Sequence, residues 1–155
     1  GVAAGAEVWV TSSSDDKIRR AIEYGAAGGF NYKDDGWSKA MSEKAGQPHL
    51  IIDSAGGSGY RDLLNLCASG GRIVNYGATA GPPEKFDLFK VFWKQLRIQG
   101  TTMGSPEDFS AMLDFVSKNR LAPIIDDVRP LDEINDAIER MSSSPQFGKL
   151  VLAIS

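Results

Sequence analysis

The chain has 155 residues, of which 42% are apolar, and this is enough to form the core of one ordinary domain. The net charge is −3 and the Lys and Arg residues are scattered, which argues against nucleic acid as the main partner. No apolar run approaches the roughly 20 residues of a membrane span, and no signal peptide opens the chain. The single cysteine, Cys67, excludes an intrachain disulfide, so we expect a cytoplasmic protein.

Short strands and helices are predicted to alternate along the first two thirds of the sequence. β-branched, aromatic and aliphatic runs predict strands at residues 8–11, 30–32, 50–52, 72–76 and 97–102. Helical spacing of apolar residues, with caps and glycine stops, predicts helices at residues 14–24, 37–45, 60–67, 86–93 and 106–119. This alternation is typical of a parallel α/β sheet, which binds ligands at the carboxyl ends of its strands.

The last of these helices carries the strongest start signal. Ser105 is predicted to cap it, with Pro106 in the first turn and an acid three residues after the serine. Its apolar residues are expected to face inward, namely Phe109, Met112, Leu113 and Val116. Beyond it, the sequence predicts an extended segment at 124–129, a helix at 131–141 and a closing strand at 149–154.

Five loops that follow predicted strands are small, hydroxylated or rich in glycine. They are residues 11–14, 32–33, 53–57, 77–81 and 102–104. Such loops let a flat or anionic ligand approach the backbone, although Gly and Ser are also common turn residues. Five in succession favour a nucleotide-type ligand. The first loop, Thr11-Ser12-Ser13-Ser14, has two possible roles from the sequence: Ser13 or Ser14 could cap the following helix, and the hydroxyls could bind an anion.

No constellation of catalytic residues is visible in the sequence. His49, the only histidine, is predicted to be a loop or edge residue, and Cys67 is predicted to pack in the core. Together they make no zinc site. Asp53 could act as a base, but it is more simply explained as a hydrogen-bond acceptor for the following turn. The aromatic run at 86–93 is interpreted as core or interface.

Several stretches stand in this order across nearly the whole chain: AGAEVWVTSSSDDKIRRAIEYGA, HLIIDSAGG, GGRIVNYGATAG, LRIQGTTMGS and FGKLVLAIS. They closely resemble the medium-chain dehydrogenase/reductase superfamily, in particular its quinone oxidoreductase-like and zinc-type alcohol dehydrogenase-like branches. The resemblance implies an NAD(P)-dependent oxidoreductase with a Rossmann-like, doubly wound parallel sheet. In the family, a hydride passes between nicotinamide and a carbonyl, alcohol, quinone or activated double bond.

The resemblance also implies a cofactor site, with NADP favoured over NAD. Ser12 falls where NAD-using members place an acid, Lys17 matches a lysine that reaches the ribose or its phosphate, and Tyr32 matches a tyrosine beside the phosphate. Ser54 and residues 77–79 match loops that, in the family, run past the adenine towards the nicotinamide. The expected cofactor-binding residues are Ser12, Ser13, Lys17, Tyr32, Ser54, Gly77, Ala78 and Thr79.

Two parts of the family pattern are absent from this sequence, the first strand and the glycine-rich loop. We therefore expect a piece of a longer protein, with an incomplete sheet. Between the strand at Val8 and the strand at Leu50 we expect either a gap or a neighbouring chain that fills it. Residues 1–123 are expected to form a partial NAD(P)-binding domain, and residues 124–155 to pack on a catalytic domain outside this sequence. Zinc cannot be decided, because the family's ligands lie in that other domain.

The favoured interpretation is an NADP-dependent reductase of a quinone, enone or carbonyl. The alternatives are a zinc-dependent alcohol dehydrogenase of the same superfamily and a cofactor-binding protein without turnover. The expected partners are a small-molecule substrate and a second copy of the chain, with no nucleic acid and no membrane. The homodimer is expected to form through the Arg97–Thr102 edge strand, beside Phe89, Phe92 and Trp93.

Overall fold

The structure is a computed structural model and describes residues 1–143 and 145–154. It divides into two compact units, Gly1–Met103 and Gly104–Ser155. The strands of the first unit are β1 (Trp9–Ser12), β2 (Gly28–Asn31), β3 (Leu50–Asp53), β4 (Arg72–Asn75) and β5 (Arg97–Gly100). Its helices are a short 3-10 turn (Val2–Ala4), α1 (Asp15–Glu23), α2 (Trp37–Ala45), α3 (Tyr60–Leu66) and α4 (Leu88–Trp93).

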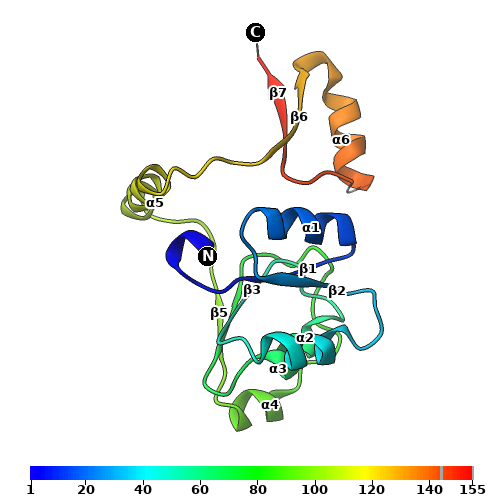
Figure 1. Cartoon of the computed structure of the whole chain (residues 1–155), viewed down its shortest axis with the longest axis vertical. Helices are drawn as coiled ribbons and strands as arrows, with labels where there is room; N and C mark the ends of the chain where they lie inside the picture. Colours follow the sequence, from blue (N-terminus) through cyan, green and yellow to red (C-terminus); the bar gives the residue numbers. More distant parts are fainter. Residues whose placement is uncertain (144, 155) are drawn as a thin grey trace. The chain divides into compact units, whose positions relative to one another are not determined.

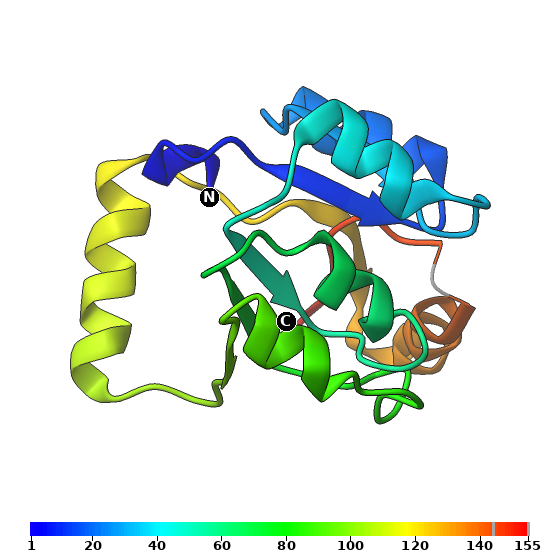
Figure 2. The same ribbon diagram turned by 90° about the horizontal axis from the view of Figure 1, so that it is seen from below.

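All strand pairs of the first unit are parallel. β1 pairs with β2, and β3, β4 and β5 form a second sheet in that order. Figure 1 shows α1 on one side of the strands and α2, α3 and α4 on the other. In the view from below, α2, α3 and α4 lie in front of the strands (Figure 2). The predicted α/β class with parallel strands is confirmed, and the predicted elements agree closely with those observed.

The two sheets of the first unit do not join. Within the described part of the chain, β1 pairs only with β2, and β3 pairs only with β4. A cleft of about 490 Å³ lies between the facing strands and is lined by Trp9, Val10 and Thr11 from β1 and by residues 50–53 from β3. The gap predicted between these strands is therefore present.

The core of the first unit lies between the β3–β4–β5 sheet and the helices α3 and α4. It consists of Tyr60, Leu64, Cys67, Ile73 and Leu96. Leu64, Cys67 and Ile73 are fully buried, which confirms the predicted packing role of the cysteine. Burial raises the pKa of the Cys67 thiol, which is the direction expected for a packing group.

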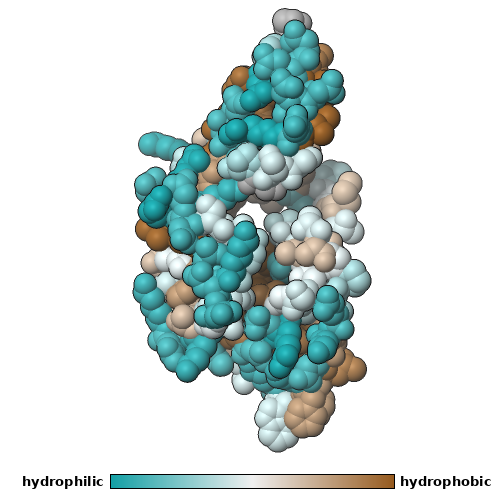
Figure 3. All heavy atoms as spheres, turned by 90° about the vertical axis from the view of Figure 1, so that its right-hand side faces the viewer, coloured by the Kyte–Doolittle hydropathy of each residue, from teal (hydrophilic) through white to brown (hydrophobic). Residues whose placement is uncertain are grey.

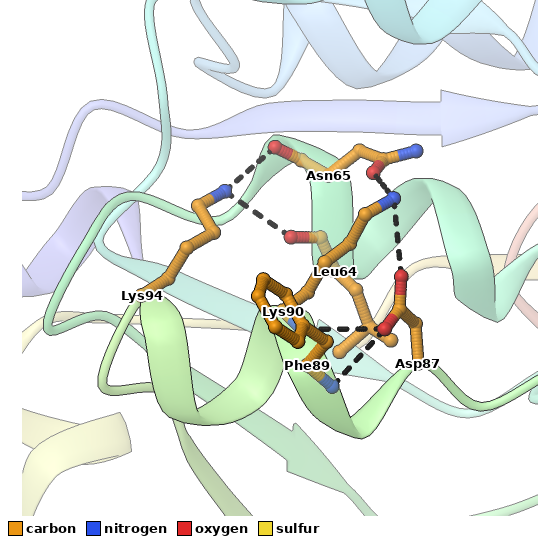
Figure 4. A network of polar contacts seen from close by, with 6 residues as sticks. All are labelled: Leu64, Asn65, Asp87, Phe89, Lys90 and Lys94. Carbon is orange, nitrogen blue, oxygen red and sulfur yellow. Dashed lines mark hydrogen bonds and ion pairs between the residues drawn. The ribbon is translucent and has the colours of Figure 1, made fainter.

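Polar side chains hold α4 against the end of α3 (Figure 4). Lys94 Nζ donates to the backbone oxygens of Leu64 at 3.2 Å and Asn65 at 2.8 Å, which satisfies carbonyl groups in the last turn of α3. Lys90 contacts the Asn65 side chain and pairs with Asp87, the residue that caps the start of α4. Burial lowers the pKa of Lys94. α4 thus holds to α3 through Lys90 and Lys94, while Val91 packs against the core.

The other side of α4 is aromatic and exposed. Phe89 is 62% exposed, Phe92 is 61% exposed and Trp93 is 73% exposed. The centroid of the Phe89 ring lies 4.8 Å from that of Phe92 and 5.8 Å from that of Trp93. Figure 3 shows hydrophobic side chains at the lower end of the molecule, where Figure 1 places α4. The aromatic run at 86–93 was predicted to lie in the core or at an interface, and the exposure of these three rings excludes the core for them. Exposed apolar clusters of this kind mark interaction surfaces.

The second unit contains α5 (Pro106–Lys118), β6 (Ile125–Pro130), a 3-10 turn (Leu131–Glu133), α6 (Ile134–Ser143) and β7 (Lys149–Ala153). β6 and β7 pair in parallel, and α6 packs against both. Asp126 ties these elements together, since its carboxylate accepts from Arg140 Nη2 at 2.7 Å and from the Phe147 amide at 2.9 Å. The sequence predicted a boundary at residue 123, beyond which the chain would pack on a catalytic domain. That domain lies outside this sequence, so the boundary stays a prediction.

The start of α5 is as predicted, but its burial is not. Ser105 Oγ accepts from the Asp108 amide at 3.1 Å, and Asp108 Oδ2 accepts from the Ser105 amide at 2.9 Å, which forms a capping box. No residue of α5 is buried, and Phe109 is 59% exposed. The prediction that its apolar residues face inward is wrong for the described chain, because the sheet of this unit packs on α6 instead.

None of the helices in the described residues combines the length and apolar character that a membrane crossing requires.

Candidate functional site

One half of the candidate site lies at the carboxyl ends of β1 and β2. Ser12 is the last residue of β1, and its carbonyl accepts from the Tyr32 amide at 3.0 Å, which places these two predicted residues side by side. Ser14 N donates to Ser12 Oγ at 3.2 Å. Ser14 is the cap of α1, because its hydroxyl accepts from the Lys17 amide at 3.4 Å. The run of hydroxyls therefore shapes the loop and begins the helix.

The acids that follow this loop are both engaged by neighbouring donors. Asp15 Oδ1 accepts from Asn31 Nδ2 at 3.0 Å, and Asp16 pairs with Arg19 at 2.8 Å. The Arg19 guanidinium partly offsets the negative charge of the first helical turn, and the neutral Asn31 amide occupies one oxygen of Asp15. The end of β1 itself carries a serine and no acid.

The other half of the site lies at the carboxyl ends of β3 and β4, where two loops interlock. Thr79 N donates to the Ser54 carbonyl at 3.2 Å, Ala80 N to the Ala55 carbonyl at 2.8 Å, and Gly57 N to the Gly81 carbonyl at 2.8 Å. These bonds bring together the predicted residue Ser54 and the predicted segment 77–79. The backbone of one loop is thus fixed to the backbone of the other.

Glycine makes this close approach possible. Gly56 and Gly57 have φ angles of 67° and 63°, which favour glycine. A Cβ on Gly56 would lie 2.6 Å from the Gly81 carbonyl oxygen, and one on Gly57 would lie 2.8 Å from Ala80 Cβ. A side chain at either position would push the loops apart.

Asp53 and Asn75, the last residues of β3 and β4, support these loops from below. The Asp53 carboxylate accepts from the amides of Ala55 at 3.2 Å and Gly56 at 3.0 Å, which confirms the predicted role in the following turn. It also accepts from Asn75 Nδ2 at 3.0 Å, and Tyr60 Oη donates to Asn75 Oδ1 at 2.8 Å. Its oxygens are committed to these donors, so nothing here supports the alternative role as a base.

A cleft of about 390 Å³ opens between the two halves. Tyr32, Thr11 and Trp37 line one side, and the opposite side is formed mainly by Asp53, Ala55, Gly56, Ser58, Gly59 and Asp62. Ser54 and Tyr32 both line the adjoining cleft between β1 and β3. Ser12, Ser13, Lys17 and residues 77–79 are not among the lining residues of these two clefts.

Of the residues that line the cleft between the two halves, only Tyr32 was predicted from the sequence as a cofactor-binding residue. Thr11 stood in a predicted ligand loop but carried no distinguishing signal. Trp37 begins α2, and only the fold brings it opposite the loop after β3. The cleft offers the hydroxyls of Thr11, Tyr32 and Ser58 and the carboxylates of Asp53 and Asp62, and no histidine or cysteine is among its lining residues. This chemistry suits binding of a polar ligand more than proton transfer.

The described residues do not form a metal site. No group of three or more His, Cys, Asp or Glu side chains within residues 1–143 and 145–154 could hold a metal ion. His49 is exposed and Cys67 is buried in the core. The described residues therefore do not provide the three or four protein ligands that bind zinc.

Comparison with known proteins places the chain in a family. The sequence profile of zinc-binding dehydrogenases matches residues 2–118. The chain is 38% identical to "Zinc-type alcohol dehydrogenase-like protein YogA" of Leptosphaeria maculans, over 99% of this chain and 46% of that protein. It is 28% identical to "Quinone oxidoreductase-like protein 2" of Bos taurus, over 96% of this chain and 46% of that protein.

A solved structure agrees with these sequence matches. The crystal structure of an NAD-dependent alcohol dehydrogenase superimposes with a TM-score of 0.89 at 32% identity, covering 97% of this chain and 45% of that one. The fold is therefore that of the Rossmann-like domain of such dehydrogenases. The chain spans less than half the length of the curated relatives that it matches.

Proposed function

Because this chain belongs to the zinc-binding dehydrogenase family, within the medium-chain dehydrogenase/reductase superfamily, we propose that it binds the nicotinamide dinucleotide of an oxidoreductase. The observation that carries the proposal is the polar cleft at the carboxyl ends of parallel strands, flanked by hydroxyl and glycine loops. Dinucleotides bind in this position in doubly wound sheets. When bound, the dinucleotide supplies or accepts the hydride.

The two halves of the site suit the two halves of such a ligand. Ser12, Ser13, Lys17 and Tyr32 are proposed to hold the adenosine ribose and its phosphate. Ser54 and the segment 77–79 are proposed to line the path towards the nicotinamide. The hydroxyls at the end of β1 lie beside the N-terminus of α1 and provide donors for phosphate and ribose oxygens.

NADP is proposed as the preferred cofactor. Support comes from the serine at the end of β1, where an acid would repel a 2′-phosphate, and from the engagement of Asp15 and Asp16 by other side chains. NAD is the second candidate, because the similar solved structure at 32% identity is described as an NAD-dependent alcohol dehydrogenase.

For the full-length protein we propose reduction of a quinone, enone or carbonyl, and a cytoplasmic location. The similarity to a quinone oxidoreductase-like protein supports this substrate class. Zinc-dependent oxidation of an alcohol is the alternative, favoured by the 38% identity to a zinc-type alcohol dehydrogenase-like protein. A cofactor-binding protein without turnover is the third possibility.

The test uses the full-length protein. Nicotinamide fluorescence should show saturable binding of NADPH, and NADPH should then be oxidised in the presence of at least one quinone, enone or aldehyde. A parallel assay of alcohols with NADP⁺, with and without added zinc, examines the alternative. Absence of dinucleotide binding would contradict the proposal, and binding without turnover of any substrate would favour the third possibility.

We also propose that the full-length protein forms a homodimer through β5. This strand pairs with β4 on one side, and all four of its residues are exposed. The amides of Arg97 and Thr101 point towards β4, so the intervening amide of Ile98 points to the open edge. An open edge beside exposed aromatic residues favours pairing with a two-fold related copy.

Ile98→Pro should therefore shift the full-length protein from dimer to monomer, because it removes an edge donor without removing a bond to β4. We expect the dissociation constant to rise about tenfold or more, since a hydrogen bond is lost and the edge is blocked at two symmetric positions. Sedimentation velocity at micromolar concentration measures the change, with Ile98→Val as the control that keeps the amide. A monomeric wild-type protein, or a dimeric Ile98→Pro variant, would contradict the β5 interface.

A further inference from the structure

A chain of three side chains runs beneath the two interlocked loops. It begins at Tyr60, the first residue of α3, which is only 3% exposed. The phenol donates to Asn75 Oδ1 at 2.8 Å, and Asn75 Nδ2 donates to Asp53 Oδ2 at 3.0 Å. The chain therefore links a helix start to the ends of two neighbouring strands.

Each member of this chain has a fixed hydrogen-bonding role. An ionised carboxylate only accepts, so the Asn75 amide must turn its nitrogen to Asp53 and its oxygen to Tyr60. Tyr60 must then act as the donor. Burial raises the pKa of Tyr60, so its hydroxyl keeps its proton at neutral pH. The ring of Tyr60 also packs near Phe86, with 5.9 Å between centroids, and this contact does not depend on the hydroxyl.

The same carboxylate holds the first loop. Asp53 accepts from the amides of Ala55 and Gly56, and this loop is bonded in turn to residues 79–81 of the second loop. The position of Ser54 and of the segment 77–79 therefore depends on the chain that starts at Tyr60. The loop at the end of β1 is shaped instead by the hydroxyls of Ser12 and Ser14.

We infer that Tyr60, Asn75 and Asp53 form a positioning network that sets the two loops for the nicotinamide half of the dinucleotide and leaves the adenosine half unaffected. The inference rests on the proposed cofactor site. The network acts on the loops through the Asp53 carboxylate, so its proposed effect is on ligand placement.

The experiment compares two ligands in the full-length protein. Tyr60→Phe removes the donor and keeps the ring. We expect it to raise the Kd for NADPH about tenfold, because the network loses one buried hydrogen bond. The Kd for adenosine 2′,5′-bisphosphate, which contains only the adenosine half, should stay within about twofold. Tyr24→Phe, at the end of α1 and outside both loops, is the control and should change neither value.

Asn75→Asp serves as a second variant, because it replaces the donor to Asp53 by an acceptor and should weaken NADPH binding in the same selective way. Equal weakening of both ligands, or of neither, would overturn the positioning role. Amide hydrogen exchange at Ala55, Gly56 and Ala80 provides a readout that does not depend on cofactor. It should quicken in Tyr60→Phe relative to the amides of β1, and unchanged exchange would overturn the inference. Failure of the wild-type protein to bind NADPH would instead overturn the proposed function.

Discussion

Extending the chain at its N-terminus with a strand that fits between β1 and β3 should raise its free energy of unfolding by about 3–6 kcal/mol, from several net hydrogen bonds of about 1 kcal/mol each and some apolar burial. The facing edges of β1 and β3 have no ladder partner in the described residues. Leu50 and Ile52 are 53% and 66% exposed beside this gap. A parallel strand would pair with both edges at once and cover part of this surface.

Urea unfolding measures the change in the free energy of unfolding. Amide hydrogen exchange provides a second test, because it shows whether the two sheets unfold separately or together. The β1–β2 pair and the β3–β4–β5 sheet share no ladder, so without the added strand they should lose amide protection separately. With the strand they should unfold together. The control is the same extension with proline at its centre, which cannot pair on both sides. Equal midpoints for the two extensions would show that the cleft does not accept a strand.

Ser12→Asp should shift the cofactor preference of the full-length protein from NADPH towards NADH by about tenfold or more, since charge-assisted bonds are worth about 1.5–3 kcal/mol each. A carboxylate at the end of β1 would accept from the ribose hydroxyls of NAD and repel a 2′-phosphate. Ser14, not Ser12, caps α1, so the substitution should leave the helix start in place. The ratio of the two dissociation constants, from fluorescence titration, is the quantity to compare.

Lys17→Ala tests the same pocket from the helix side. Loss of the ammonium group should weaken NADPH far more than NADH, because only NADPH carries the extra phosphate. Lys39→Ala, on the exposed side of α2, removes the same charge elsewhere and should leave the ratio unchanged. If the wild-type protein binds NADH as tightly as NADPH, or if neither substitution alters the ratio, the hydroxyl run acts only as a helix cap.

Features that depend on a few consecutive residues could be predicted from the sequence. The Ser105–Asp108 capping box, the turn held by Asp53 and the alternation of strands and helices all follow from local chemistry. The resemblance to the dehydrogenase superfamily located the gap between β1 and β3, since that prediction required knowledge of strand order.

Features that depend on how distant segments meet could not be predicted. Tyr60 and Asn75 are separated by fifteen residues, and nothing local indicates that the phenol reaches the amide. Trp37 enters the cleft only because α2 lies opposite the loop after β3. The apolar spacing of α5 predicted a buried side, but amphipathic spacing alone does not identify the surface that covers a helix, and Phe109 is exposed.

The close contact at Gly56 also limits how this region can vary among related sequences. A methyl group there would meet a backbone oxygen of the second loop, which cannot rotate away as a side chain can. A replacement at position 56 is therefore tolerated only if residues 77–81 shift as well, so the two loops are expected to diverge together. Gly59, three residues later, has open space around its missing Cβ. Packing therefore does not couple a replacement at Gly59 to the second loop, in contrast to one at Gly56.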